Sequence, residues 1–232
     1  SGLSAFAALY LLGALGAAST DTCSAFWALL AAAARGKLGD YARCLRSRPG
    51  RMLMLAAVLG GPAASTCYVL GLQSAGSLVV PVSAMCPAIG AVLGRVLFRQ
   101  ALSPRMLLGI GICAAAGVMI GSTGLAEGAP PHLFRGLVFG FLAALGWGLE
   151  GCVGGYASAL VDPEIGIAIR QTTSSLTNLV LLVPLFSVLG GVDPVAMVTA
   201  AFTDAAAMPW FMAAGLGASF GFMLWYKGNA MC

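Results

Sequence analysis

The sequence predicts an all-α membrane protein, a polytopic bundle of helices. Hydrophobic residues make up 59% of the 232 residues and charged residues only 9%, whereas a soluble domain carries about 25% charged residues. The mean hydropathy is +0.94. The apolar residues form long runs without the strict alternation that a transmembrane barrel requires. Because helices satisfy their own backbone hydrogen bonds in lipid, we expect the spans to be helical.

Seven segments are apolar over about 20 residues, the length that crosses a bilayer as a helix. Ser103-Pro104 favours a helix start, since proline suits the first helical turn. Prolines inside other spans predict kinks, which membrane helices tolerate. A longer loop containing Asp193 and Asp204 is expected before the last helix. The predicted helices cover residues 4–34, 52–72, 77–98, 104–122, 134–158, 165–189 and 207–229.

The first predicted helix contains a polar cluster, Ser19-Thr20-Asp21-Thr22. As one helix this segment would be about 46 Å long, which exceeds an upright span but is too short for two. We favour a single tilted helix with Asp21 inside it. The alternative is a turn at the polar cluster, after a shorter first span.

Basic residues are concentrated in the loops on one side of the predicted spans. Arg135 alone is expected on the other side. The positive-inside rule therefore predicts a multi-pass protein of the cytoplasmic membrane, with loop 35–51 in the cytoplasm and loop 123–133 outside. The residues on the basic side are Arg35, Lys37, Arg43, Arg46, Arg48, Arg51, Arg95, Arg99, Arg105 and Lys227.

Two charged residues lie well inside the helices that flank the turn at Asp162-Pro163. Glu150 belongs to the helix before the turn and Arg170 to the helix after it. By helix rise both fall roughly 9–12 Å inside the same membrane face. Ionisable residues at that depth are costly and usually face a cavity or a partner. We therefore predict that Glu150 and Arg170 approach each other. A purely structural ion pair is the alternative.

The surroundings of Arg170 carry more polar groups than an ion pair requires, which favours a binding site. Trp147 precedes Glu150 by one helical turn and is placed to wall a cavity. Glu150 would hold a proton, a cation or a cationic group, and Arg170 a carboxylate or phosphate. The predicted substrate-binding residues are Glu150, Arg170, Trp147, Gln171, Ser174 and Asp21.

Other functional classes have weaker support. The seven cysteines are scattered without a CxxC pair, so no metal site, disulfide framework or cofactor is predicted. The basic residues sit at membrane edges, so no nucleic-acid partner is expected. The G-x-S-x-G match around Ser219 would suggest an intramembrane serine hydrolase. His132, the one histidine, lies at the outer edge of a different helix, and we interpret the motif as packing glycines. A non-transporting scaffold is a third possibility.

A weak internal repeat suggests how the helices are arranged. Residues 20–30 and 170–180 each place a polar cluster before an apolar half-helix. Residues 59–70 and 213–224 share small-residue spacing before an aromatic and aliphatic end. The two halves would have opposite membrane orientations. That plan is typical of secondary transporters, whose site lies between the repeats near mid-membrane.

Residues 77–121 end a proline-containing span and begin a glycine-rich one, with the motif positions Pro87, Leu93, Leu102, Ser103 and Gly109. On these positions the segment resembles the end of an EamA repeat of the drug/metabolite transporter superfamily. Gln100 stands where that family usually has glutamate. Residues 142–157 and 215–230 resemble the first and third helices of the second repeat.

The resemblance implies a ten-helix fold of two inverted five-helix repeats, of which about seven helices are present. Residues 1–123 would be a first repeat without its first helix, and residues 134–232 a second repeat without its last two. We therefore expect a secondary transporter rather than an enzyme. Its substrate would be a small polar metabolite, amino-acid-like or otherwise charged, moved across the bilayer by alternating access, with a proton or cation as the candidate coupling ion.

Overall fold

A computed structural model of the chain describes residues 5–126 and 130–231. Within those ranges the regular elements are helices, and no strand occurs. The helices form two compact units. The first unit comprises Ser1–Val58 and Gly154–Cys232, and the second comprises Leu59–Val153. An α-helical protein, as the composition predicts, is confirmed for the described residues. The repeat boundary between residues 123 and 134 stays a prediction.

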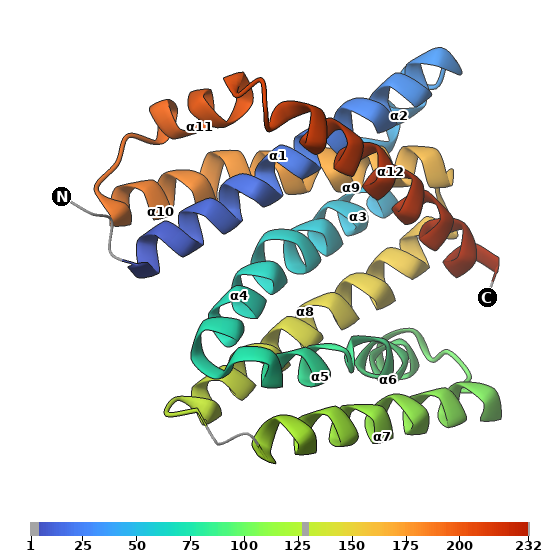
Figure 1. Cartoon of the computed structure of the whole chain (residues 1–232). Coiled ribbons are helices and arrows are strands. Elements are labelled where there is room, and N and C mark those ends of the chain that lie inside the picture. The colour runs from blue at the N-terminus through green and yellow to red at the C-terminus, as the bar shows by residue number, and fades with distance from the viewer. Residues whose placement is uncertain (1–4, 127–129, 232) are drawn as a thin grey trace. The chain divides into compact units, whose positions relative to one another are not determined.

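The first unit begins with α1 (Ala5–Ala34), one continuous helix of 30 residues (Figure 1). The single long helix is thus confirmed, and the alternative turn at residues 19–22 is wrong. Its predicted start at residue 4 lies outside the described residues. One hydroxyl of residues 19–22 bonds within the helix, because Thr22 Oγ1 donates to the carbonyl of Ala18 at 2.6 Å.

The predicted basic loop is instead largely helical, which corrects the sequence analysis. Residues 38–46 form α2 (Leu38–Arg46), and α3 (Arg48–Val58) begins four residues earlier than expected. In α2, Leu38, Tyr41 and Leu45 recur at helical spacing, and Tyr41 and Leu45 pack against the core of the first unit. The arginines occupy the opposite, exposed face. The many charged residues of this segment led us to assign it to a loop, although its apolar residues recur with helical periodicity.

The helix predicted for residues 165–189 is found as α9 (Pro163–Thr177), a π-helical turn η3 (Asn178–Leu182) and α10 (Val183–Gly190). Asp162 caps α9, because its side chain accepts a hydrogen bond from the backbone N–H of Glu164. The π-helical turn ends two residues before Pro184, which cannot donate a backbone hydrogen bond. Gly191, with φ of 69°, ends the segment in the left-handed region.

The expected loop before the last helix contains a helix of its own, which is a second correction. It is α11 (Pro194–Thr203), and Asp193 caps it through a hydrogen bond from the backbone of Val195. Pro194 in the first turn completes the start signal. The last helix, α12 (Met208–Met231), follows. The start of α11 could have been read from the sequence.

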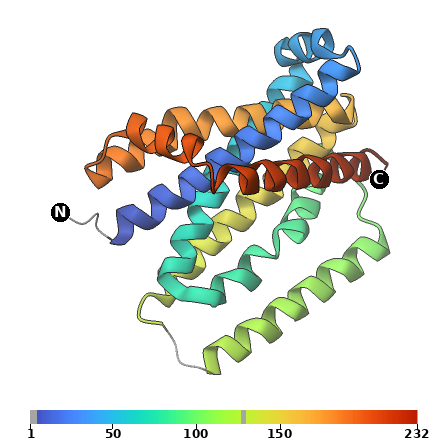
Figure 2. The ribbon, with the colours of Figure 1, turned by 45° about the horizontal axis from the view of Figure 1, so that its top comes forward.

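Four helices make the framework of the first unit. α1 runs beside α9 and α10 and is crossed by α12, as Figures 1 and 2 both show. One core cluster includes Leu53, Ile169 and Tyr226. A second cluster packs the N-terminal half of α1, through Leu11, against Val183 of α10. The contact between α1 and α9 is the most extensive of the unit and positions the polar side chains described below.

The second unit begins with the π-helical turn η1 (Leu59–Ala63) and α4 (Ala64–Ala75). The single helix predicted for residues 77–98 is wrong. It is divided into a short 3-10 turn, η2 (Gly76–Leu78), α5 (Val79–Ser83) and α6 (Cys86–Phe98). Pro87 lies in the first turn of α6, and a proline in a helix interior would clash with the preceding turn. The proline produces a new helix rather than a kink.

Two longer helices complete the second unit. α7 (Pro104–Ala126) extends past its predicted end at residue 122, and residues 127–129 of the predicted outer loop lie outside the described residues. α8 (Leu133–Ser158) matches its prediction within one residue and continues into the first unit at its C-terminal end. Contacts within the second unit are very close at glycines. A Cβ at Gly136 would lie 2.2 Å from the Cβ of Ala75, so the two helix backbones nearly touch there.

Four helical stretches among the described residues are long and apolar enough to cross a membrane. The predicted spans at α1, α6 and α7 are not among them. Shorter apolar stretches among the described residues include Cys86–Phe98 and Pro104–Ile120. The structure is therefore consistent with a helical membrane protein. The four stretches are Arg48–Ser83, Leu133–Ser158, Pro163–Gly190 and Met208–Gly228.

Candidate functional site

A buried charge pair joins α1 and α9 in the first unit. Arg170, which is 6% exposed, lies midway along α9, between the apolar residues 165–169 and the polar residues 171–175. Its Nη1 is 3.8 Å from Oδ1 of Asp21 on α1. The side chain of Asp21 is only 16% exposed, so both charges are largely desolvated. Of the predicted site residues, Asp21 and Arg170 are therefore brought together.

The second oxygen of Asp21 is held by two polar side chains one turn apart. Ser174 Oγ donates to Asp21 Oδ2 at 2.5 Å, and Asn178 Nδ2 donates to the same oxygen at 3.3 Å. Asn178 is the first residue of the π-helical turn η3, and such turns occur frequently at functional sites. Ser174 was predicted as a site residue. Asn178 was not, although it lies two helical turns after Arg170.

Arg170 is fixed by two further contacts. Its Nη1 donates to Oε1 of the neighbouring Gln171 at 2.8 Å. Its guanidinium lies over the ring of Phe222 from α12, with Cζ 4.0 Å from the ring centroid. Gln171 is 0% exposed, and its amide nitrogen Nε2 has no hydrogen-bond partner. This places an unsatisfied pair of N–H donors beside the guanidinium.

The other predicted site residues lie in the second unit, on α8. Trp147 Nε1 donates to the carbonyl of Gly60 at 2.8 Å, and its ring is 5.2 Å from that of Tyr68. Glu150, 5% exposed, packs against the same residue, since a Cβ at Gly60 would lie 1.7 Å from Glu150 Oε2. Gly60 belongs to the π-helical turn η1, where Pro62 removes a backbone donor.

The predicted pairing of Glu150 with Arg170 connects residues of different units. Glu150 belongs to the second unit and Arg170 to the first. The approach of these two side chains accordingly stays a prediction. Within the first unit, the carboxylate beside Arg170 is that of Asp21.

A second ionic cluster, which the sequence analysis missed, joins the end of α1 to the start of α9. Lys37 Nζ lies 2.6 Å from Oδ2 of Asp162 and 3.2 Å from Oε2 of Glu164. Arg35 also pairs with Glu164. The charges suit the helix dipoles, because the anions lie at a helix start and the cations follow a helix end. The sequence signal for this cluster was the position of its charged residues, which lie after the end of one helix and at the start of another.

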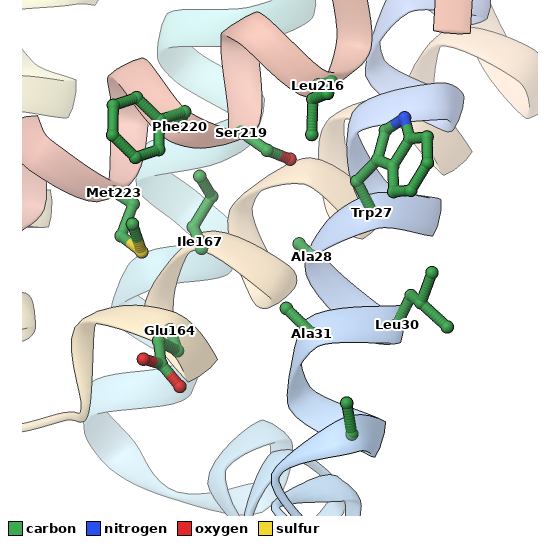
Figure 3. Close-up of a pocket in the computed structure, with 11 residues that line it drawn as sticks. Trp27, Ala28, Leu30, Ala31, Glu164, Ile167, Leu216, Ser219, Phe220 and Met223 are labelled. Atoms are coloured by element: carbon green, nitrogen blue, oxygen red, sulfur yellow. The ribbon is translucent and has the colours of Figure 1, made fainter.

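An apolar groove of about 290 Å³ lies between α1, α9 and α12 (Figure 3). Trp27, Leu216 and Phe220 line it, and among the described residues of its lining Glu164 is the charged one. Asp21 and Arg170 are not part of it. The groove is thus a different feature from the Asp21–Arg170 pair, and its composition suits hydrocarbon rather than a polar metabolite.

Ser219 also borders this groove but lacks the setting of a catalytic serine. It lies inside α12, whereas a nucleophile elbow requires a strand-to-helix turn. Its Oγ donates to the carbonyl of Ser24 at 2.7 Å and lies 2.9 Å from Ser24 Oγ. The hydroxyl therefore links α12 to α1, as expected if the motif serves packing.

No protein-family model matches the chain, and no curated protein matches it. The resemblance to EamA repeats therefore depends on the sequence motifs alone. The function of the chain is therefore argued from the geometry around the Asp21–Arg170 pair.

Proposed function

We propose that this chain belongs to a secondary transporter that moves a small, charged polar metabolite across the cytoplasmic membrane by alternating access. The observation that carries the proposal is the Asp21–Arg170 pair inside a helical membrane protein. Ionisable residues within membrane helices usually mark substrate or ion pathways. A purely structural pair would not need the additional unsatisfied donors of Gln171.

The π-helical turns support the same interpretation. Asn178, which starts η3, holds Asp21, and Gly60 in η1 contacts both Trp147 and Glu150. Irregular helical backbone in a membrane protein is tolerated where it is buried in protein or lines a cavity. In secondary transporters such interrupted helices form the substrate and ion sites, which is the architecture expected for two inverted five-helix repeats.

Ligand-induced thermal stabilisation tests the proposal. The purified chain would be screened in detergent against amino acids, organic acids, sugar phosphates and amines. We expect one class to raise the melting temperature of the wild type, and Arg170→Gln to abolish that shift. Arg135→Gln is the matched control, because Arg135 lies in the second unit and donates to Ser74. Stabilisation that survives Arg170→Gln would contradict this site.

The membrane orientation can be tested separately. The basic segment around α2 would face the cytoplasm, by the positive-inside rule. In a cysteine-free background, Arg46→Cys should be inaccessible to a membrane-impermeant thiol reagent in intact cells and labelled in inverted vesicles. Ser122→Cys, which is also an exposed position, should show the opposite pattern. Labelling of Arg46→Cys from outside would contradict the orientation.

A further inference from the structure

The unpartnered donors beside Arg170 indicate what class of ligand the site accepts. Gln171 presents a buried Nε2 without a partner, and its Oε1 already accepts from Arg170. Rotating the amide by 180° would place Nε2 against the guanidinium, where two donors would face each other, so the oxygen assignment is chemically sound. Gln171 Nε2 therefore offers its N–H donors at a position adjacent to the guanidinium. Donors are satisfied by an acceptor, and a desolvated guanidinium favours an anionic one.

Asp21 is the carboxylate that faces Arg170. Its Oδ1 is 3.8 Å from Arg170, which is a loose contact for an ion pair, while Oδ2 is held by Ser174 and Asn178. If an anion approached Arg170 while Asp21 stayed ionised, two negative charges would share one desolvated site. Like charges that share a site disfavour joint ionisation, and one carboxylate then takes up a proton. Asp21 is the carboxyl placed to do so.

We propose that the substrate is a small carboxylate or phosphate anion that binds Arg170 and Gln171 together with one proton on Asp21; this rests on the proposed transport function. The proton comes from bulk water and binds Oδ1, and no covalent bond of the substrate changes. Oδ2 keeps its hydrogen bonds from Ser174 and Asn178. One positive and one negative charge enter together, so the net charge of the site is unchanged. Proton and anion would cross the membrane together.

Other charged groups near α1 do not disturb this exchange. Arg170 faces Asp21 from α9. On α12, Ser219 contacts α1 at Ser24, and Lys227 lies eight residues further, about 12 Å along the helix. The charged residues of α2 and of the Arg35–Glu164 cluster follow the C-terminal end of α1, more than three turns from Asp21. Glu150 belongs to the second unit. Asp21 is therefore the group in the first unit whose protonation compensates the negative charge of an anion bound at Arg170.

Calorimetry with matched probes tests the inference. Lactate and glycerol phosphate would be compared with lactamide and glycerol, their uncharged analogues, on the full chain. We expect only the anions to bind, with affinity falling about tenfold per pH unit while Asp21 is ionised, because one proton is taken up per anion. Titration in buffers of different ionisation enthalpy should report uptake of one proton.

Three variants separate the roles. Asp21→Asn, which mimics the protonated acid, should bind anions without pH dependence and without proton uptake. Gln171→Glu keeps an oxygen for Arg170 but removes the amide donors, and should weaken anion binding at least a hundredfold while preserving thermal stability. Arg135→Gln should behave as the wild type. A merely structural role for Gln171 would change stability without this selective loss of anion affinity.

The outcomes distinguish this inference from the proposed function. If amines or uncharged metabolites bind and the anions do not, the inference is overturned and the transport proposal stands. If anions bind with equal affinity at all pH values in wild type and Asp21→Asn, the proton coupling is overturned. If no metabolite in the broad screen binds the wild type, the proposed function itself fails.

Discussion

In the first unit the main helix contact, between α1 and α9, is made partly by polar side chains. In the second unit the close helix contacts are made at glycines, which have no side chain. Between α1 and α9, Asp21 meets Arg170 and Ser174, and Thr22 Oγ1 lies 2.6 Å from Ser175 Oγ. In the second unit, by contrast, glycines allow the helix backbones to approach. A Cβ at Gly146 would lie 3.0 Å from the carbonyl oxygen of Leu59.

The difference shows where chemistry is concentrated in a molecule that is apolar overall. In lipid, apolar side chains gain little by leaving the acyl chains for another helix, so close packing of small residues holds helices together. The second unit largely follows this rule. Between α1 and α9, polar contacts take the place of small-residue packing. Desolvated charges there need an opposite charge and hydrogen bonds to be tolerated. Because burying charges costs free energy, a helix contact that retains them is a candidate binding site.

Removing Asp21 should have the largest effect on stability. Asp21→Ala would deprive Arg170 of a nearby counter-charge and leave the donors of Ser174 and Asn178 unsatisfied. Breaking a buried pair by removing one partner costs about 3–5 kcal/mol. Thr22→Val, at the adjacent position, loses hydrogen bonds of a hydroxyl and should cost about 1 kcal/mol. Titration with SDS would measure both free energies of unfolding, and equal losses would contradict a charge-dependent contact.

Adding one methyl group to the second unit should have an intermediate effect. In Gly136→Ala the new Cβ would lie 2.2 Å from the Cβ of Ala75 and 2.9 Å from its backbone nitrogen, so a helix must shift. Overpacking of this kind costs about 1–3 kcal/mol. Gly109→Ala on α7 is the matched control, because nothing lies within 4 Å of its Cβ. The control should be neutral or stabilising, and similar losses in both variants would show that close packing is not the cause.

The sequence predicted the long helices better than their contacts. Runs such as 134–158 are apolar over their whole length, and their ends agree with α8. Helices α2 and α11 were missed because we assigned a charged segment and an Asp-containing segment to loops. The proline-rich segment 77–98 was predicted as one helix because hydropathy alone does not register a lost backbone donor.

The candidate site was predicted in part of its residues but not in its arrangement. Asp21 and Arg170 were both identified from their depth in apolar helices. Depth along a helix does not say which helix lies beside it, and these two residues are far apart in the chain. The sequence therefore favoured Glu150, on the preceding helix, as the partner of Arg170. The donors from Ser174 and Asn178 follow only once α1 is placed beside α9.

The smallest predicted effect distinguishes the two kinds of ion pair in the first unit. Glu164 is 8% exposed and pairs with both Arg35 and Lys37. Asp40, in contrast, pairs with Arg43 one turn along α2, and both side chains are at least half exposed. Exposed pairs contribute about 0–1 kcal/mol and are screened by salt. The Glu164 cluster links two helices in a partly desolvated setting, so it should contribute more.

We therefore expect Glu164→Gln to cost about 1 kcal/mol and Asp40→Asn less than about 0.5 kcal/mol. The amide of Glu164→Gln still accepts hydrogen bonds, so the loss would report the charge rather than the side-chain volume. Melting temperatures at low and high salt would separate the two sites. The Glu164→Gln loss should fall less at high salt, because partly buried pairs are screened less, whereas the effect of Asp40→Asn should disappear. Equal salt sensitivity would mean that the end of α1 is held to α9 by packing, and that Asp21 and Arg170 provide the essential charged contact between these helices.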